Sequence, residues 1–158
     1  GVPERHVQKT DPSGQHCMKV EDCCNKPNDI QRHCYAHHCK KTAQLVAEKL
    51  NLKEEQYSIS FQSRLGPIPW LKPYTDKTIE ELAQKGVKQL GVACPAFVSD
   101  CLETLEEIGE EGDEEFQENG GEKLTLIPCL NTRDDWVDVL CLLMNDKSCF
   151  IQDKPIFT

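Results

Sequence analysis

Residues that could bind a metal are concentrated in one short stretch of the sequence. Residues 16–39, HCMKVEDCCNKPNDIQRHCYAHHC, contain five of the ten cysteines and four of the five histidines. Thiolates and imidazoles are ligands that proteins offer to zinc, copper and iron–sulfur clusters. The stretch also carries too many charged and amide side chains for a buried strand or helix. It is therefore interpreted as a site.

Three chemistries compete for this segment, whose cysteines follow the pattern C-x5-C-C-x9-C-x4-C. A zinc site would typically show paired C-x2-C motifs, which are missing, although CYAHHC could supply mixed ligands. A disulfide pair would need an oxidising compartment. An iron–sulfur cluster needs four thiolates, which a folded loop can gather at irregular spacing. The pattern by itself leaves the three open.

Composition limits the remaining possibilities. A chain of 158 residues is the size of one ordinary domain, and we expect a single domain over 1–158. The net charge of -9 disfavours binding to nucleic acid or to an anionic membrane. No apolar run is long enough to span a bilayer, and the opening GVPERHVQKTD contains neither a signal-peptide core nor an initiator methionine. These features predict part of a soluble protein.

The remaining cysteines divide into two groups. Cys149 has no local partner in the sequence and is left unassigned. The others lie in apolar runs, where a free thiol behaves as a small hydrophobic side chain. These predicted core thiols are Cys94, Cys101, Cys129 and Cys141.

Hydrophobic periodicity predicts the elements that must position any site. Apolar residues at helical spacing predict a helix over 39–51, and alternation in QYSISF predicts a strand over 57–61. A helix from a cap at Thr75 or Asp76 is expected to stop at Gly86, and VKQLGVAC should form the next strand. Ser99 or Asp100 should then cap a helix that buries Leu102, Leu105 and Ile108. KLTLIPC predicts a third strand, and RDDWVDVLCLLMND predicts a final amphipathic or buried helix.

This alternation of helices and strands predicts an α/β fold with at least three parallel strands in a sheet flanked by helices. Ligands of such sheets bind at the carboxyl ends of the strands. In this chain those ends are FQSR, ACPAFVSD and IPCLN. We therefore expect a binding site where these three segments meet.

The same segments carry a resemblance to a known family. FQSRLGPIPWLKPYTD, CPAFVSDCLETLEEI, the GGEK turn and IPCLN resemble, in order and spacing, the C-terminal half of ferrochelatase, and the similarity runs from Gly1 to about Met144. The resemblance implies one half of a chelatase-type fold. It also implies a part in inserting ferrous iron into a porphyrin during haem biosynthesis, a cytoplasmic lyase reaction whose substrates are porphyrin and ferrous iron.

The resemblance also implies what the chain needs for activity. The opening GVPER resembles the family's His-Gly-Ile-Pro segment, whose catalytic histidine would lie one position before Gly1. We therefore expect no turnover from this chain without the N-terminal half of the same enzyme. His6, the nearest histidine, falls at a variable position of the family and is not given that role.

Individual roles follow from the same motifs. Glu103 matches the catalytic carboxylate, and Glu103 with Glu107 could hold the substrate iron. Glu110 or Glu111 could continue this line of acids, with a plain solvated acidic face as the alternative. The residues implied to face the porphyrin are Gln62, Ser63, Arg64 and Trp70, of which Arg64 could pair with a propionate. Trp70 could instead be a packing aromatic, and Lys72 and Tyr74 are weaker candidates.

The cysteine-rich segment, over 14–39, resembles an insertion that carries a 2Fe-2S cluster in some bacterial ferrochelatases. The resemblance implies four cluster ligands, with zinc as the alternative: Cys17, Cys34, Cys39 and one of Cys23 and Cys24, of which Cys24 is slightly favoured. We expect the histidines beside them to be solvated or near the ligands. Because the segment has few apolar residues, ligation should supply its order. The alternative function is an iron–sulfur or zinc module on a non-catalytic chelatase-like scaffold.

Overall fold

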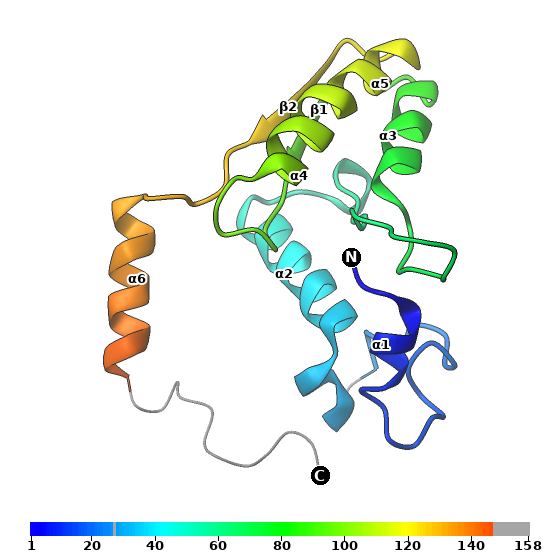
Figure 1. Cartoon of the computed structure of the whole chain (residues 1–158), viewed down its shortest axis with the longest axis vertical. Coiled ribbons are helices and arrows are strands. Elements are labelled where there is room, and N and C mark those ends of the chain that lie inside the picture. Colours follow the sequence, from blue (N-terminus) through cyan, green and yellow to red (C-terminus); the bar gives the residue numbers. More distant parts are fainter. Residues whose placement is uncertain (27, 147–158) are drawn as a thin grey trace.

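The computed structural model describes residues 1–26 and 28–146, which form a set of helices around a small parallel sheet (Figure 1). The helical elements are, in order, α1 (Glu4–Gln8), η1 (Asp29–His33), α2 (Tyr35–Lys49), η2 (Glu54–Gln56), α3 (Thr75–Gln84), α4 (Leu102–Thr104), η3 (Leu105–Glu111), α5 (Gly112–Glu118) and α6 (Asp134–Asn145). The strands are β1 (Gln89–Ala93) and β2 (Lys123–Ile127). The α/β class with parallel strands is confirmed.

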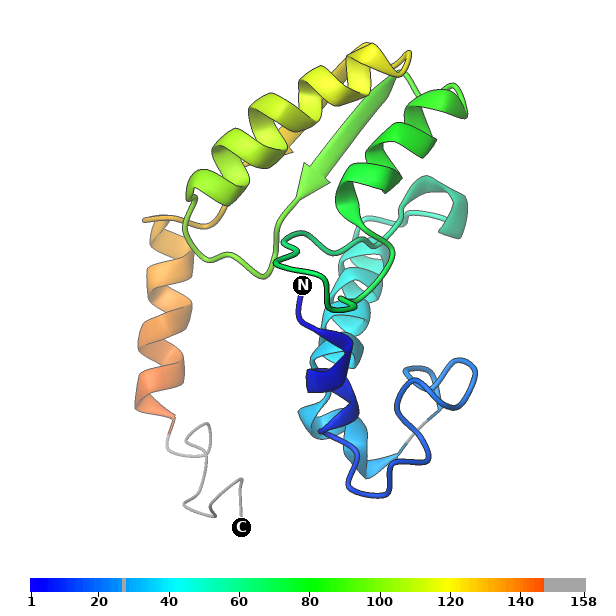
Figure 2. The same ribbon diagram turned by 45° about the vertical axis from the view of Figure 1, so that its right-hand side comes forward.

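The sheet and its covering helices form one layered unit. β1 pairs in parallel with β2, in a register that runs from Gln89 opposite Lys123 to Ala93 opposite Ile127. Helix α3 and the continuous α4–η3–α5 segment lie on the same side of the sheet (Figure 2). Apolar side chains of these elements meet in a core made of Ile79, Ala83, Ile108, Phe116 and Leu124. The carboxyl ends of both strands therefore point toward the loops that carry the predicted site.

The first predicted strand, over 57–61, does not form, and within the described residues the sheet has two strands rather than three. Only Phe61 makes a bridge, in parallel with Tyr74. Its N–H donates to the carbonyl of Pro73 at 2.9 Å, and its carbonyl accepts from the N–H of Thr75 at 3.3 Å. The Phe61 ring packs in a second apolar cluster with Val7 and Leu71. The segment is thus held by the neighbouring loop instead of by β1.

The glutamate-rich segment α4–η3–α5, called the acidic helix below, differs most from its prediction. Its first cap is Cys101, rather than Ser99 or Asp100, and a π-helical turn, η3, interrupts it. A π turn advances each residue by a smaller angle than an α turn, so it shifts which side chains face the sheet. Ile108 is buried as predicted, but Leu102 and Leu105 are exposed, which corrects their assignment to the core.

Two glycines let this segment lie close to its neighbours. A Cβ atom on Gly109 would lie 3.3 Å from Cδ2 of Leu126 on the sheet. A Cβ atom on Gly112 would lie 3.4 Å from Cδ1 of Ile79 on α3. The distance at Gly109 is tighter than ordinary side-chain packing, whereas that at Gly112 is an ordinary contact, so glycine permits the close approach chiefly at position 109. The contact between Gly109 and Leu126 therefore brings η3 close to the sheet.

Several smaller predictions are corrected. Helix α2 begins at Tyr35, one turn before the predicted start, and Tyr74 rather than Thr75 or Asp76 caps α3. Helix α6 is amphipathic but has no buried residue, and Cys141 on it is exposed. Cys129 is buried as predicted, whereas Cys94 and Cys101 are half-buried. Cys149 lies outside the described residues.

Candidate active site

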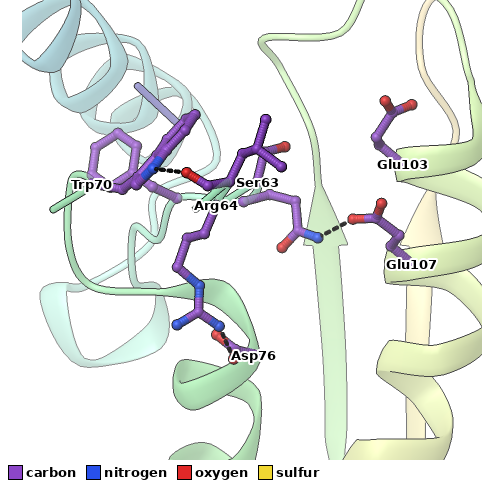
Figure 3. A pocket seen from close by; sticks show the side chains of 9 residues that line it. Ser63, Arg64, Trp70, Asp76, Glu103 and Glu107 are labelled. Atoms are coloured by element: carbon purple, nitrogen blue, oxygen red, sulfur yellow. Dashed lines mark hydrogen bonds and ion pairs between the residues drawn. The ribbon is translucent and has the colours of Figure 1, made fainter. Parts of the chain in front are cut away.

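A pocket of about 370 Å³ lies between the loop that follows Phe61 and the start of the acidic helix (Figure 3). All the residues that the sequence motifs implied for porphyrin and substrate iron line this one pocket: Gln62, Ser63, Arg64, Trp70, Glu103 and Glu107. Phe61, Leu65 and Asp76 complete its wall. The structure therefore brings together side chains from segments that are about forty residues apart in the sequence.

The loop that carries the first four of these residues is anchored to the N-terminus of the chain. Trp70 forms an antiparallel bridge with Pro3, and the N–H of Glu4 donates to the carbonyl of Pro69 at 3.0 Å. The indole N–H of Trp70 donates to the carbonyl of Leu65 at 3.2 Å, which closes the loop on itself. Ser63 has a φ of 71°, a left-handed conformation that turns the chain sharply at the pocket. These contacts hold the half-buried indole at the pocket wall.

Arg64 does not project freely into the pocket. Its guanidinium forms an ion pair with Asp76, the second residue of α3 (Figure 3). Its Cζ atom also lies 4.2 Å from the centre of the Tyr74 ring, a cation–π contact. A carboxylate ligand at this position would have to replace Asp76 as the partner of the guanidinium. The sequence did not predict that Asp76 would pair with Arg64, although both residues belong to the motif FQSRLGPIPWLKPYTD.

Glu103 and Glu107 present carboxylates from one side of the same helix. A hydrogen bond from the Cys101 thiol, followed by one from its own backbone, lowers the pKa of Glu103. The Glu103 side chain is exposed and is therefore ionised at neutral pH. The Glu107 carboxylate accepts a hydrogen bond from the side-chain amide of Gln62. The pocket thus offers an ionised carboxylate next to a carboxylate that is already bound to the loop.

A second pocket, of about 390 Å³, continues from the first along the acidic helix. Gln62, Asp76 and Glu107 line both pockets. The second also takes in Glu106, Glu111 and Glu115, whereas Glu110 lines neither. The line of acids therefore runs through Glu111.

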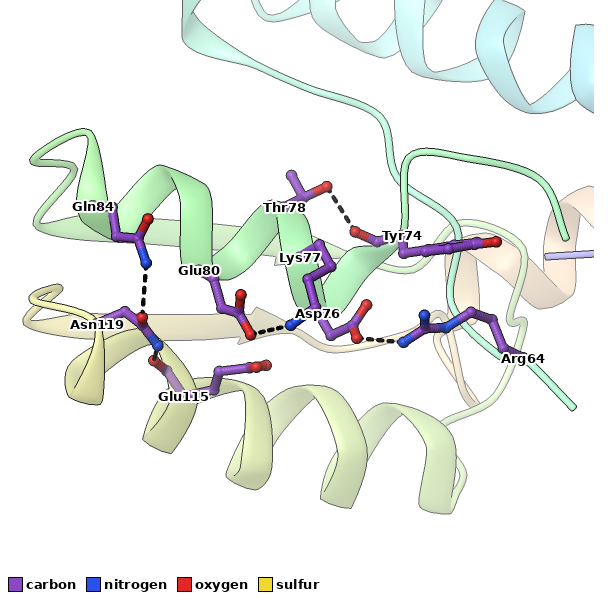
Figure 4. Close-up of polar contacts among 9 residues, drawn as sticks. All are labelled: Arg64, Tyr74, Asp76, Lys77, Thr78, Glu80, Gln84, Glu115 and Asn119. Carbon is purple, nitrogen blue, oxygen red and sulfur yellow. Dashed lines mark hydrogen bonds and ion pairs between the residues drawn. The ribbon is translucent and has the colours of Figure 1, made fainter. Parts of the chain in front are cut away.

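Polar side chains of α3 and α5 lie near Glu115, a residue of the second pocket (Figure 4). Lys77 donates to the Glu80 carboxylate at 2.5 Å, and Gln84 donates to the side-chain oxygen of Asn119 at 3.1 Å. Burial is the largest cause that raises the pKa of Glu115, followed by its hydrogen bond with Glu80. Lys77 thus compensates part of the negative charge near Glu115.

The predicted cluster ligands gather in the second apolar core of the molecule. Cys17, Cys24 and Cys34 are buried there with Val7, Ala36, Phe61 and Leu71, and Cys23 and Cys39 pack against them. Burial raises the pKa of Cys24 to about 11 and raises that of Cys17 as well. At neutral pH these thiols are protonated, so a bound metal would have to displace their protons.

The donor set suits a thiolate-bound group, but the thiols are not arranged as a ready coordination sphere. Within residues 1–26 and 28–146, no three histidine, cysteine or acidic side chains converge as metal ligands. The five cysteines share one cluster. Binding a metal centre there therefore requires the thiols to turn toward a common point.

Three of the four histidines of this segment contact the backbone through their rings. The ring of His16 donates to the carbonyl of Cys23 at 3.1 Å, and that of His37 donates to the carbonyl of Cys24 at 2.8 Å. The ring of His38 donates to the carbonyl of Arg32 at 3.1 Å.

The sequence did not predict a role for Asp11. This residue is buried, and its carboxylate accepts hydrogen bonds from the N–H groups of His16 and Cys17 at the start of the segment. The turn sequence DPSG was the available signal.

Comparison with known proteins decides the family. The sequence model of ferrochelatase matches residues 1–148. The chain belongs to the ferrochelatase family. Ferrochelatases of Stutzerimonas stutzeri and Ectopseudomonas mendocina are 53% and 54% identical to it over 144 residues, and that of Azotobacter vinelandii is 50% identical. Each alignment covers 90% of this chain, which confirms the resemblance seen in the motifs.

The alignments cover less than half of each of these relatives. The chain spans 42% of the length of the first two of these ferrochelatases and 43% of the third. Among the helices that the structure describes, none has the length and apolar character needed to cross a membrane.

Proposed function

We propose that this chain is the part of a ferrochelatase that supplies one wall of the porphyrin site and a carboxylate for metal insertion. The supporting observation is the single pocket that Gln62, Ser63, Trp70, Glu103 and Glu107 line together. Ferrous iron and a porphyrin are the proposed substrates, and haem biosynthesis is the proposed setting. We expect the reaction to take place in the cytoplasm, where the many free thiols of the chain stay reduced.

The proposed chemistry uses the two sides of the pocket differently. The indole of Trp70 offers a flat apolar surface against which a macrocycle can lie. Glu103 faces this surface as an ionised carboxylate, which can accept pyrrole protons or bind ferrous iron through oxygen. Glu107 and the acids of the second pocket raise the local concentration of a divalent cation through their negative charge. Arg64 can pair with a propionate once its contact with Asp76 is exchanged.

The proposed partner is the remaining part of the longer enzyme, which corresponds to the family's N-terminal half. Two features support it: the relatives are more than twice as long as this chain, and large apolar side chains are exposed on three elements. These side chains include Val46 on α2 and Leu50 directly after it, Leu102 on α4, and Leu142 and Met144 on α6. Burying such side chains on a partner removes apolar surface from water. We therefore expect turnover only from the joined protein.

The experiment compares this chain alone with the same chain joined to the upstream half of a ferrochelatase. Ferrous iron and porphyrin are supplied anaerobically, and haem formation is followed by absorbance. We expect haem only from the joined protein. A joined protein that binds porphyrin without forming haem would contradict the proposed reaction. A chain that is fully active alone would contradict the proposed need for a partner.

For the cysteine-rich segment we propose a bound 2Fe-2S cluster, with zinc as the alternative. The support is the donor set: five thiols in one apolar cluster, with Cys17, Cys34 and Cys39 as ligands and Cys24 rather than Cys23 as the fourth. Such a group, when bound, would cross-link α2 to the loop before it. Anaerobic absorption spectra with iron, sulfide and zinc assays on the purified chain distinguish the two groups.

The second candidate function is a metal-binding module on a scaffold that has no catalytic role. The observation that favours it is the separation of the two sites, since none of the five cysteines lines either pocket. This function predicts a metal-loaded protein that binds no porphyrin even when joined to the upstream half. Porphyrin titration of the joined protein therefore decides between the two functions.

A further inference from the structure

Asp11 is a buried carboxylate at the start of the cysteine-rich segment, and only 5% of it is exposed. Its Oδ1 atom accepts hydrogen bonds from the N–H and the hydroxyl of Ser13, at 3.0 and 2.6 Å. Its Oδ2 atom accepts from the N–H groups of His16 and Cys17, at 2.7 and 3.0 Å. Both oxygens are therefore used to fold the backbone of residues 13–17 around one side chain.

This carboxylate connects Cys17 to the rest of the fold. The N–H of Asp11 donates to the carbonyl of Gln8 at the end of α1, at 3.1 Å. The residue before Gln8, Val7, packs in the same apolar cluster as Cys17. The hydroxyl of Thr10 lies 3.9 Å from the Cys17 sulfur. The sulfur is thus placed by a short chain of contacts that begins in a helix and passes through Asp11.

Side chains from the other end of the segment hold Cys24 in a comparable way. The side-chain amide of Gln31, in η1, donates to the carbonyls of Cys24 and Lys26, each at 2.8 Å. The ring of His37, in α2, donates to the carbonyl of Cys24 at 2.8 Å. Backbone groups that would otherwise be left without regular pairing are satisfied by these donors. Cys17 and Cys24 are therefore held by groups from the two ends of the segment.

We propose that Asp11 is a positioning residue that holds Cys17 in the apolar cluster that also contains Cys34, while Gln31 and His37 do the same for Cys24. These thiols are thereby gathered in one cluster before any ligand binds, and a ligand has only to turn them toward a common point. The use of this arrangement rests on the proposed metal-binding function, but the arrangement itself depends only on hydrogen bonds within the chain. It adds a source of order to the segment besides ligation.

The test measures how fast each thiol reacts with iodoacetamide in the chelator-treated chain, by mass spectrometry of peptides. Asp11→Asn keeps the size of the side chain but replaces one of the two accepting oxygens by an NH2 group, which cannot accept a hydrogen bond. A hydrogen bond to a charged acceptor is worth more than a neutral one, so the loss should favour local opening. We expect alkylation of Cys17 to accelerate by at least about tenfold, with Cys129, which is buried but lies outside this cluster, unchanged. Gln31→Ala should accelerate Cys24 instead.

The matched control is Asp22→Asn, which makes the same chemical change in the same loop. Asp22 is exposed and has a φ of 53°, a conformation that asparagine also tolerates. Its variant should leave every alkylation rate as in the parent. Equal protection of Cys17 in the parent and in Asp11→Asn would overturn the proposal. Equal acceleration of all buried thiols, Cys129 included, would also overturn it, because Asp11 would then support the whole fold.

The same samples separate this inference from the proposed cluster. Iron, sulfide and zinc contents of the parent are measured before the chelator is added. Selective acceleration of Cys17 in a chain that binds no metal would retain the positioning role and refute the cluster. Bound metal with unchanged Cys17 reactivity in Asp11→Asn would retain the cluster and refute the positioning role.

Discussion

The side-chain amide of Gln62 donates a hydrogen bond to the carboxylate of Glu107, which lies 45 residues further along the chain. This bond joins the loop after Phe61 to the π turn, and both residues line both pockets. It is the direct link between the proposed porphyrin wall and the acidic segment.

Gln62→Ala should loosen this loop. A hydrogen bond of this kind contributes about 1 kcal/mol, so amide hydrogen exchange in residues 63–65 should become roughly three- to tenfold faster. Gln84→Ala is the control, because it removes an amide hydrogen bond to Asn119 between α3 and α5. Equal exchange of the loop in both variants would show that Gln62 does not hold it.

Glu103→Ala should abolish iron insertion in the joined protein. A positioned acid or base contributes about 100-fold or more to the rate, so the loss should be at least that large. The circular dichroism spectrum should not change, because the side chain is exposed and contributes little to the core. Glu110→Ala, on the same helix but outside both pockets, should stay within a few-fold of the parent. Activity near the parent value in Glu103→Ala would remove this residue from the mechanism.

Single cysteine replacements should separate ligands from bystanders. Cys17→Ser, Cys34→Ser and Cys39→Ser should each bleach a 2Fe-2S cluster, because the cluster needs all four thiolates. Cys24 is buried and Cys23 is half-buried, so Cys24→Ser should bleach more than Cys23→Ser. Cys141→Ser, at an exposed position of α6, is the control. A colourless protein with stoichiometric zinc would show that the segment binds the other metal.

Gly121→Ala should destabilise the fold through one contact. A Cβ atom on Gly121 would lie 2.3 Å from Cε1 of Phe116, whose side chain is fully buried. Such overpacking costs about 1–3 kcal/mol of unfolding free energy, measurable by urea denaturation. A Cβ atom on Gly91 would meet nothing within 4 Å, so Gly91→Ala should be close to neutral. Equal stability of the two variants would mean that Phe116 has room to move.

The stability of the chain should fall in acid partly through Asp113. Its carboxylate accepts hydrogen bonds from Lys123 Nζ and from the N–H of Leu124, which lower its pKa from 3.8. A lowered folded-state pKa gives stability that is complete above the unfolded value and is lost as the pH falls through the folded value. Between pH 5 and about 3, the parent should therefore lose more unfolding free energy than Asp113→Asn. Asp138→Asn, exposed on α6, should keep the steep loss of the parent.

Local patterns of the sequence predicted the parts of this protein that depend on neighbouring residues. Both strands of the sheet and helices α2, α3 and α6 were found from periodicity, with ends that moved by a turn or less. The motifs around Gln62 and Glu103 indicated the pocket residues, and the density of thiols indicated a separate cluster. These features can be predicted from the sequence because a helix face, a strand and a motif each depend on only a few neighbouring residues.

The tertiary structure decided what the same patterns left open. Alternation in residues 57–61 suits a strand, yet Phe61 pairs with the loop at Pro73 and packs beside Val7, since strand pairing depends on a distant partner. Helical spacing placed Leu102 in the core, but in the folded chain Leu102 is exposed, and Glu111 lines the second pocket. The sequence DPSG indicated a turn at Asp11 but not its role, because that role exists only where the folded backbone brings four donors to one carboxylate. Contacts between residues far apart in the chain carry free energy that no local pattern records.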